Sequence, residues 1–313
     1  MKILFMGTPD FALFSLKALV ESGEDVIGVV TQPDKPKGRG YELTPPPVKV
    51  YALEKGLPVY QPATLRGDEF AALLSELDPE LIVVVAYGKI LPKNVLDYPK
   101  HGCINVHGSL LPAYRGAAPM QRAIIDGCAV TGITTMYMAE GLDTGDMLLK
   151  DEIAIEQTDN FEDIHDRLGA CGANTLLRTI AALKEGTLVP EQQNDALATY
   201  AAKIEKADCL LDFSHGAQSL HDRIRGLSPI PLAFTHTPDG KLLKILAARV
   251  SDAACPDGIA PGTVLSLEDG EIVVACGNAT SLALLRVLPE GKGRMAAADF
   301  IRGRKIAVGD VLK

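Results

Sequence analysis

Tryptophan is absent from the 313-residue chain, and aromatic residues make up only 5% of it. Long apolar runs are absent as well, because none approaches the roughly 20 residues that a membrane-spanning helix needs. The opening residues, MKILFMGTPD, reach Pro9 and Asp10 before an apolar segment of signal-peptide length can form. We therefore expect no secretory signal and no membrane association. The hydrophobic fraction of 47% is enough for a sizeable core in one large domain or two ordinary ones.

The six cysteines are far apart in the sequence and include no C-x-x-C pair. Zinc ligation and disulfides are therefore not expected, and reduced thiols in a cytoplasmic protein are. The net charge of −9 argues against a chain that coats nucleic acid with basic residues. The charge is uneven, however, since residues 1–202 carry 17 basic and 27 acidic residues, and residues 203–313 carry 14 and 13. Any polyanion would have to bind to a local basic patch.

Apolar strands alternate with helices in the predicted structure of the first 185 residues. Expected strands are 2–7, 26–32, 80–87, 102–106, 132–139 and 147–155, and expected helices lie after residue 8 and over about 46–55 and 160–185. Thr8 is expected to cap the first helix, with Pro9 at its first position and Gly23 beyond its end. His165 is expected at a helix surface. This alternation of helices with continuous apolar strands is typical of a parallel sheet covered on both faces.

The alternation of apolar strands and helices ends after Gly186. Residues 187–208 are polar and irregular and are interpreted as a linker, and a short helix is expected over about 214–226. Brief apolar runs separated by turn signals then follow, which predicts a small antiparallel barrel or sandwich.

The segment CINVHGSLLP (103–112) carries the first candidate chemistry. Asn105 and His107 lie two residues apart at the end of a predicted strand, so both side chains point to the same face. On its own this pattern also fits two residues that merely cap a strand and satisfy loop hydrogen bonds. The segment GLDTGD (141–146) places Asp143 in a turn after an apolar strand, where its carboxylate could lie beside the imidazole.

Together, INVHGSLLPAYRGAAPMQRAI and GLDTGD resemble the folate-dependent formyltransferases. Further segments, among them TPDFALFSLKAL, QPDKPKGRG, AYGKILP, TYAAKIEKAD and MAAADFIRGRKIAVGDVL, are similar to the methionyl-tRNA branch of that family. The resemblance implies an α/β fold, with a Rossmann-like parallel-sheet catalytic domain over 1–189, a linker over 190–206 and a small C-terminal OB-like β-barrel that binds tRNA over 207–313. It implies a monomer that moves the formyl group of 10-formyltetrahydrofolate to the α-amine of methionine on initiator tRNA.

The resemblance also assigns roles to individual positions. The catalytic residues are Asn105, His107 and Asp143. The folate-binding residues are Ser109, Leu110, Leu111, Pro112, Tyr87, Gly88 and Ile90. The basic loop 34–47, with Lys35, Lys37 and Arg39, is assigned to the acceptor end of tRNA, although most basic loops are simply solvated. On the C-terminal domain, Arg302, Arg304 and Lys305 lie in a basic stretch that could follow a phosphate backbone or be an ordinary charged surface. No metal site is expected.

These residue types suit acyl transfer without a covalent intermediate. The amine would attack the formyl carbon, Asn105 would donate a hydrogen bond to the developing oxyanion, and His107 would stabilise that charge or protonate the leaving nitrogen. Asp143 would keep His107 cationic or accept the amine proton through a water.

Two alternatives remain at this point. A formyltransferase on the same scaffold could act on a sugar nucleotide or another small amine, but it should lack the basic loop. A nucleotide-binding module without catalysis would need a G-x-G-x-x-G turn after the first strand, where the sequence has GTPDFA. The sequence also departs from the family at Ile230, where relatives often carry an aromatic residue.

Overall fold

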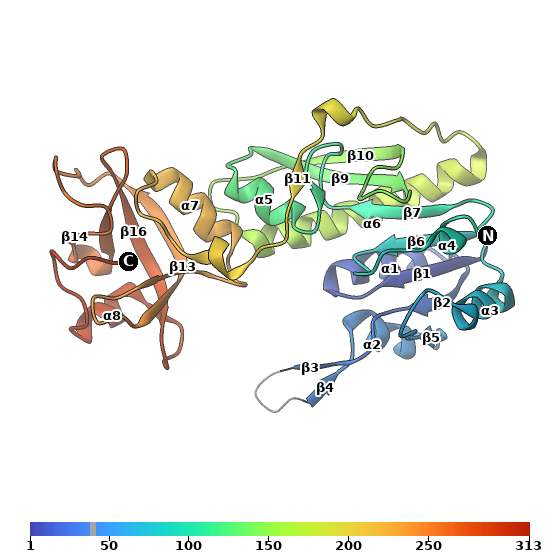
Figure 1. Cartoon of the computed structure of the whole chain (residues 1–313), viewed down its shortest axis with the longest axis horizontal. Helices are drawn as coiled ribbons and strands as arrows, with labels where there is room; N and C mark the ends of the chain where they lie inside the picture. Colours follow the sequence, from blue (N-terminus) through green and yellow to red (C-terminus); the bar gives the residue numbers. More distant parts are fainter. Residues whose placement is uncertain (38–41) are drawn as a thin grey trace. The chain divides into compact units, whose positions relative to one another are not determined.

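A computed structural model describes residues 1–37 and 42–313. Their contacts divide the chain into two compact units (Figure 1). The first unit consists of Met1–Gly116, Val130–Ile153 and His165–Ala201, and the second of Ala117–Ala129, Ala154–Ile164 and Ala202–Lys313. Two segments from the middle of the chain thus belong with the C-terminal residues. The predicted domain limits, 1–189, 190–206 and 207–313, stay a prediction.

The first unit is built on a seven-stranded sheet. In spatial order its strands are β10 (Met147–Ala154), β9 (Val130–Tyr137), β7 (Cys103–His107), β6 (Leu81–Val85), β1 (Ile3–Gly7), β2 (Val26–Val30) and β5 (Val59–Tyr60). The strands from β7 to β5 pair in parallel, as their continuous apolar sequences predict. Strand β9 is an exception because it runs antiparallel to β7, with Thr134 opposite His107. The predicted parallel sheet is thus confirmed for the strands from β7 to β5, and β9 departs from it because an apolar strand sequence does not encode its direction.

Helices cover both faces of this sheet (Figure 1). On one face, Leu4 and Ile82 belong to a core cluster with Phe70 of α3 (Asp68–Leu77) and Val95 of α4 (Lys93–Leu96). On the other face lie α1 (Asp10–Glu21) and α6 (Phe161–Glu185). A Cβ at Gly172 would lie 3.0 Å from a methyl group of Val106 of β7, so α6 lies close against that strand.

The start of α1 differs from its prediction. Pro9 occupies the cap position, and no side chain caps the helix. The Thr8 hydroxyl instead donates to the Tyr87 carbonyl oxygen at 3.0 Å and accepts from the Gln32 N–H at 3.4 Å. A long-range contact at the carboxyl edge of the sheet has therefore displaced the local cap. Gly23 does follow the helix with a φ of +78°.

His165 is also less exposed than predicted. Its side chain is 14% exposed, with Nε2 3.4 Å from the Asp10 carboxylate and Nδ1 2.9 Å from that of Asp166. Its ring centroid lies 5.5 Å from that of Phe11 and 6.3 Å from that of Phe14. The sequence pattern showed the neighbouring acids but not the packing of α1 against α6.

The second unit contains a six-stranded antiparallel sheet, as the runs of short apolar segments predict. The main path is β12 (Ala233–His236), β13 (Leu242–Ser251), β16 (Thr280–Pro289), β15 (Ile272–Cys276) and β14 (Val264–Ser266), and β17 (Met295–Ala296) pairs with β16. Helices α7 (Ala217–Gly226) and α8 (Ala297–Arg302) complete its core. Helix α5 (Pro119–Ile125) packs on α7, and Gly226 permits this approach because a Cβ there would lie 2.8 Å from the Ile125 side chain.

The predicted helices over 46–55, 160–185 and 214–226 are confirmed as α2 (Pro47–Glu54), α6 and α7. Within the stretch interpreted as a linker, β11 (Tyr200–Ala201) pairs in parallel with β8 (Arg115–Gly116). In the parts of the chain that the structure describes, no helix is long and apolar enough to cross a membrane. Those parts also contain no cluster of side chains that could hold a metal ion.

Candidate active site

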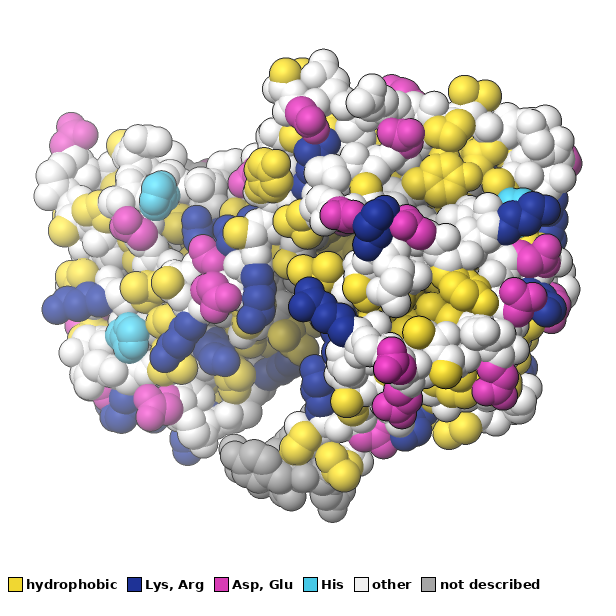
Figure 2. All heavy atoms as spheres, turned by 45° about the vertical axis from the view of Figure 1, so that its right-hand side comes forward, with side chains coloured by type: hydrophobic (Ala, Val, Ile, Leu, Met, Phe, Trp, Pro, Cys, Tyr) yellow, Lys and Arg dark blue, Asp and Glu magenta, His cyan; other side chains and the backbone are white. Residues whose placement is uncertain are grey.

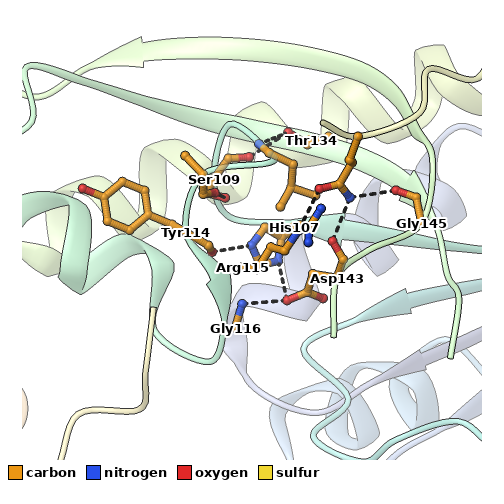
Figure 3. A network of polar contacts seen from close by, with 11 residues as sticks. His107, Ser109, Tyr114, Arg115, Gly116, Thr134, Asp143 and Gly145 are labelled. Atoms are coloured by element: carbon orange, nitrogen blue, oxygen red, sulfur yellow. Dashed lines mark hydrogen bonds and ion pairs between the residues drawn. The ribbon is translucent and has the colours of Figure 1, made fainter. Parts of the chain in front are cut away.

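His107 is the last residue of β7, and its side chain is 7% exposed. The Nε2 atom lies 3.0 Å from the Tyr114 carbonyl oxygen, and Nδ1 lies 3.7 Å from an oxygen of the Asp143 carboxylate (Figure 3). Both ring nitrogens therefore face acceptors. A neutral imidazole can donate a proton toward only one of them, whereas an imidazolium can donate toward both. The surroundings of His107 are suited to a ring that carries positive charge during part of a reaction.

Asp143 reaches His107 from an unexpected direction. Because β9 is antiparallel to β7, its end lies beside the start of β7, where the Met138 N–H donates to the Cys103 carbonyl at 2.8 Å. The following loop must run back along the sheet to bring Asp143 to the other end of β7. At Asp143 the backbone is left-handed, with a φ of +51°, and the Gly116 N–H donates to its carboxylate at 2.8 Å.

Gly145 makes this loop possible. A Cβ at this position would lie 1.8 Å from the Tyr137 carbonyl oxygen, which is far inside van der Waals contact. The GLDTGD motif therefore needs glycine at 145 for close backbone approach. Left-handed residues other than glycine also occur at Ala86 and Tyr114, in two neighbouring loops of the first unit. Strained backbone of this kind gathers at functional sites in many proteins.

Asn105 lies two residues before His107 on β7, so its side chain points to the same face of the sheet. The residue is half-buried, and within residues 1–37 and 42–313 its amide has no hydrogen-bond partner. A half-buried amide without a protein partner is free to bind a ligand. The structure thus brings His107 and Asp143 into contact and leaves Asn105 available beside them.

The predicted folate segment is held by hydrogen bonds from the hydroxyls of Ser109 and Thr134 to its backbone. The Ser109 hydroxyl donates to the Ala113 carbonyl at 2.6 Å, and Ser109 is fully buried. The Thr134 hydroxyl donates to the Ser109 carbonyl at 2.8 Å and accepts from the Leu111 N–H at 3.0 Å. Leu111 is buried beside Met136, and the Leu111–Pro112 peptide is cis. Ser109 and Leu111 therefore shape the turn with their side chains, and Leu110, which is half-buried, keeps some surface for a ligand.

The other predicted folate residues lie after β6. Tyr87 is 2% exposed and belongs to the core, and burial raises its pKa to about 12. Its carbonyl accepts hydrogen bonds from Thr8 and Gln32. Gly88 has a φ of +83°, and Ile90 is 85% exposed. Tyr87 can thus meet a ligand only through its backbone, whereas Ile90 presents an apolar side chain.

The basic residues predicted to bind tRNA lie on both units. Lys35 and Lys37 belong to β3 (Lys35–Lys37), which forms a hairpin with β4 (Glu42–Thr44), and Arg39 lies outside the described residues. The neighbouring Asp34 accepts two 2.8 Å hydrogen bonds from the ammonium group of Lys49, which lowers the pKa of Asp34. Asp34 and Lys49 therefore form an ion pair directly before the start of β3.

On the second unit, Arg304 and Lys305 are exposed just after α8. Arg302 is exposed as well and pairs with Asp299. Figure 2 shows lysine and arginine side chains interspersed with acidic ones on the face in view. The charge at Arg302 is thus partly neutralised, whereas Arg304 and Lys305 have no ion pair with an acid in the described chain.

Comparison with known proteins identifies the family. Residues 1–180 match the formyl transferase family model, and residues 203–305 match that of the formyl transferase C-terminal domain. A methionyl-tRNA formyltransferase of Bacillus subtilis is 50% identical over 311 residues, which cover 99% of this chain and 97% of that protein. The chain belongs to the methionyl-tRNA formyltransferase family. A further member, from Caldanaerobacter subterraneus, is 50% identical over 314 residues and is covered completely.

More distant formyltransferases share the fold. The N-formyltransferase from Helicobacter canadensis, solved with folinic acid and dTDP-3-aminofucose, has a TM-score of 0.66 at 17% identity, covering 91% of this chain and 98% of that one. HypX from Aquifex aeolicus, solved with tetrahydrofolic acid, has a TM-score of 0.63 at 16% identity and covers 96% of this chain. The chain spans about half of HypX, 47% of its length. At these identities the likeness shows the fold alone.

Sequence reasoning missed three polar residues around the site of this family member. Thr134 joins Ser109 to Leu111, Gln193 contacts the Asp143 loop, and Thr199 contacts Tyr114. Gln193 and Thr199 lie in the stretch interpreted as a linker. No local signal marks them, because their partners are 50 and 85 residues away in sequence.

Proposed function

We propose that Asn105, His107 and Asp143 catalyse the transfer of the formyl group of 10-formyltetrahydrofolate to the α-amine of methionine on charged initiator tRNA. The observation that carries this assignment is the approach of the Asp143 carboxylate to His107 within 3.7 Å, with the Asn105 amide on the same face of β7 and without a hydrogen-bond partner among the described residues. Membership of the methionyl-tRNA formyltransferase family supports the donor, the acceptor and the role in translation initiation.

The reaction exchanges one carbon–nitrogen bond for another. The neutral amine attacks the formyl carbon, and negative charge develops on the formyl oxygen. Asn105 donates a hydrogen bond to that oxygen, and the charged imidazole of His107 stabilises it or gives a proton to the departing folate nitrogen. Asp143 stabilises the imidazolium and takes the proton of the attacking amine through a water. The carbon–nitrogen bond to folate then breaks, and no covalent enzyme intermediate forms.

Folate would bind beside this group of residues. The backbone of 109–112 and the loop after β6 provide polar groups, and Leu110 and Ile90 provide apolar surface. Lys35, Lys37 and Arg39 would contact the acceptor end of tRNA, while Arg302, Arg304 and Lys305 would contact its phosphate backbone. Lys35, Arg304 and Lys305 support this role by their exposure.

A small amine such as a sugar nucleotide is the alternative acceptor. The structural likeness to a sugar N-formyltransferase concerns the fold, whereas the relatives at 50% identity over the whole chain carry the tRNA function in their names. A competition assay with Met-charged initiator tRNA and a dTDP-amino sugar tests the choice. We expect formyl-methionyl-tRNA to form and the sugar to remain unmodified; preferential formylation of the sugar would contradict the proposal.

The family resemblance also supports two further proposals, namely that the enzyme is a monomer and that it acts in the cytoplasm. Light scattering on the purified full chain tests the first. A mass of one chain, 33.3 kDa, is expected, and twice that mass would contradict it.

A further inference from the structure

Residues 193–201 contact the two groups that face the ring nitrogens of His107, namely the turn that carries Asp143 and the backbone of Tyr114. Gln193 is 7% exposed and donates two hydrogen bonds from its amide nitrogen, to the carbonyl oxygens of Asp143 and Gly145, each at 2.7 Å. These two carbonyls belong to the turn that carries the catalytic carboxylate (Figure 3). The Gln193 amide therefore fixes the backbone on which Asp143 stands.

Arg115 belongs to the same network through its hydrogen bond to Gln193. Its guanidinium is 2% exposed and donates to the Gln193 side-chain oxygen at 2.9 Å and to the Asp195 carboxylate at 2.8 Å. The next residue, Gly116, donates its N–H to the Asp143 carboxylate. A buried guanidinium needs such partners, because an unpaired buried charge is costly. Gln193 thus holds the backbone of Asp143 and Gly116 holds its carboxylate. Arg115 connects the two, because it bonds to Gln193 and precedes Gly116 in the chain.

The second neighbour of His107 is held by Thr199. The Tyr114 N–H donates to the Thr199 hydroxyl at 2.8 Å, and the Arg115 N–H donates to the Thr199 carbonyl at 2.8 Å. The Tyr114 carbonyl faces Nε2 of His107. One short segment therefore sets the positions of the carbonyl on one side of the imidazole and of the carboxylate on the other.

We infer that Gln193 and Thr199 are positioning residues for formyl transfer, acting through Asp143 and Tyr114 on His107. Neither side chain needs to touch a substrate. This inference rests on the proposed function, because it requires His107 and Asp143 to act in catalysis. Misplacement of reacting groups by about 1 Å can cost on the order of 100-fold in rate, so loss of this support should appear in the chemical step rather than in binding.

The substitution Gln193→Glu separates the two halves of the network. A glutamate can still accept from Arg115, but it cannot donate to the carbonyls of Asp143 and Gly145. Gln193→Met keeps the size of the side chain and removes its hydrogen bonds to Arg115 and to the two carbonyls. Gln192→Glu is the matched control, since this neighbouring glutamine is exposed and makes the same change of charge. Thr199→Val changes an exposed position, where folding is least at risk. Its control is Thr187→Val, at an exposed position just beyond the end of α6.

The experiment measures single-turnover formyl transfer with both substrates saturating, and folate affinity in parallel. We expect Gln193→Glu and Gln193→Met to lose about 10- to 100-fold in rate, and Thr199→Val to lose about 3- to 10-fold. Folate affinity should stay within about twofold of the wild type, and both controls should behave as the wild type. A merely structural role would lower rate and affinity together.

Three results would overturn the inference: wild-type rates in folded Gln193 and Thr199 variants, loss of folate affinity that matches the loss of rate, or an equal loss in Gln192→Glu. If the Gln193 variants do not fold, Thr199→Val alone decides. His107→Ala is measured beside them. A full rate in His107→Ala would reject the proposed function itself, whereas a slow His107→Ala with normal positioning variants would reject only this inference.

Discussion

The Asp143 carboxylate lies 3.7 Å from Nδ1 of His107, although His107 ends β7 and Asp143 follows β9, a strand that runs in the opposite direction. Strand β9 runs antiparallel to β7 and carries the chain away from His107 before the loop returns. Glycine at 145 lets the loop pass close to the Tyr137 carbonyl, where a Cβ would not fit. The geometry of the site therefore depends on a backbone feature as much as on its two ionisable side chains.

Asp143→Asn should slow turnover by about 10- to 1000-fold. The asparagine oxygen can still accept from the Gly116 N–H, so the loop should keep its place, while the negative charge facing His107 is lost. Steady-state kinetics with Met-charged initiator tRNA measure the effect. Asp146→Asn is the control, because this exposed carboxylate lies in the same loop. Unchanged turnover in a folded Asp143→Asn enzyme would exclude a role for the charge.

Gly145→Ala should destabilise the protein by more than about 3 kcal/mol or displace the Asp143 loop, because a Cβ there overlaps the Tyr137 carbonyl. Gly186→Ala is a suitable comparison. Its φ is +67°, but apart from its chain neighbours no atom of the described residues lies within 4 Å of the added Cβ, so only the cost of left-handed backbone, about 1 kcal/mol, is expected. Thermal melting of the two variants shows the difference, and equal melting temperatures would contradict the close approach at Gly145.

His165 should make stability depend on pH. The Asp10 carboxylate, followed by that of Asp166, raises the pKa of His165, and the same contact lowers the pKa of Asp10. For the raised histidine, stabilisation is complete below its ordinary value of 6.5 and is lost as pH rises through the folded value. For the lowered aspartate, stabilisation is present above its ordinary value of 3.8 and is lost as pH falls through the folded value.

The pair therefore stabilises the fold most between about pH 4 and pH 6.5. His165→Gln should lower stability more at pH 5.5 than at pH 9, by no more than about 1 kcal/mol, because the Asp10 side chain is 72% exposed. Denaturant melts at the two pH values measure this difference. A larger loss at pH 9 than at pH 5.5 would contradict the ion pair.

Replacement of Arg304 and Lys305 by alanine should weaken tRNA binding and reduce its salt dependence. Each lost phosphate contact should lower the slope of log affinity against log salt by about 1. Lys35→Ala should act in the same direction, while folate affinity stays unchanged. Lys100→Ala is the control, since this exposed lysine precedes the start of β7, away from His107. Salt slopes that do not change would remove these residues from the proposed tRNA contact.

Local sequence signals predicted part of this structure well. Continuous apolar runs identified the strands of the first sheet except the short β5. The period of two residues placed Asn105 and His107 on one face of β7. The glycines around Asp143 indicated a tight turn. These features depend on neighbours in sequence, so they can be read without knowledge of the tertiary structure.

The remaining features depend on distant partners. Thr8 bonds to Tyr87 rather than capping its helix, and His165 is partly buried by packing between two helices. The direction of β9 follows from the route of the chain and not from its apolar residues. Gln193 lies in an otherwise polar, irregular stretch, and its buried hydrogen bonds cross 48 and 50 residues of sequence.

The most direct measurement of the proposed chemistry is the rate of formyl transfer from 10-formyltetrahydrofolate to Met-charged initiator tRNA by His107→Ala and Asn105→Ala. Asn94→Ala, at an exposed position on α4, is the control for the amide. We predict a loss of about 100- to 1000-fold in each site variant with folding and folate binding intact. Near-normal turnover in folded His107→Ala would contradict the central claim that this imidazole acts on the reacting formyl group.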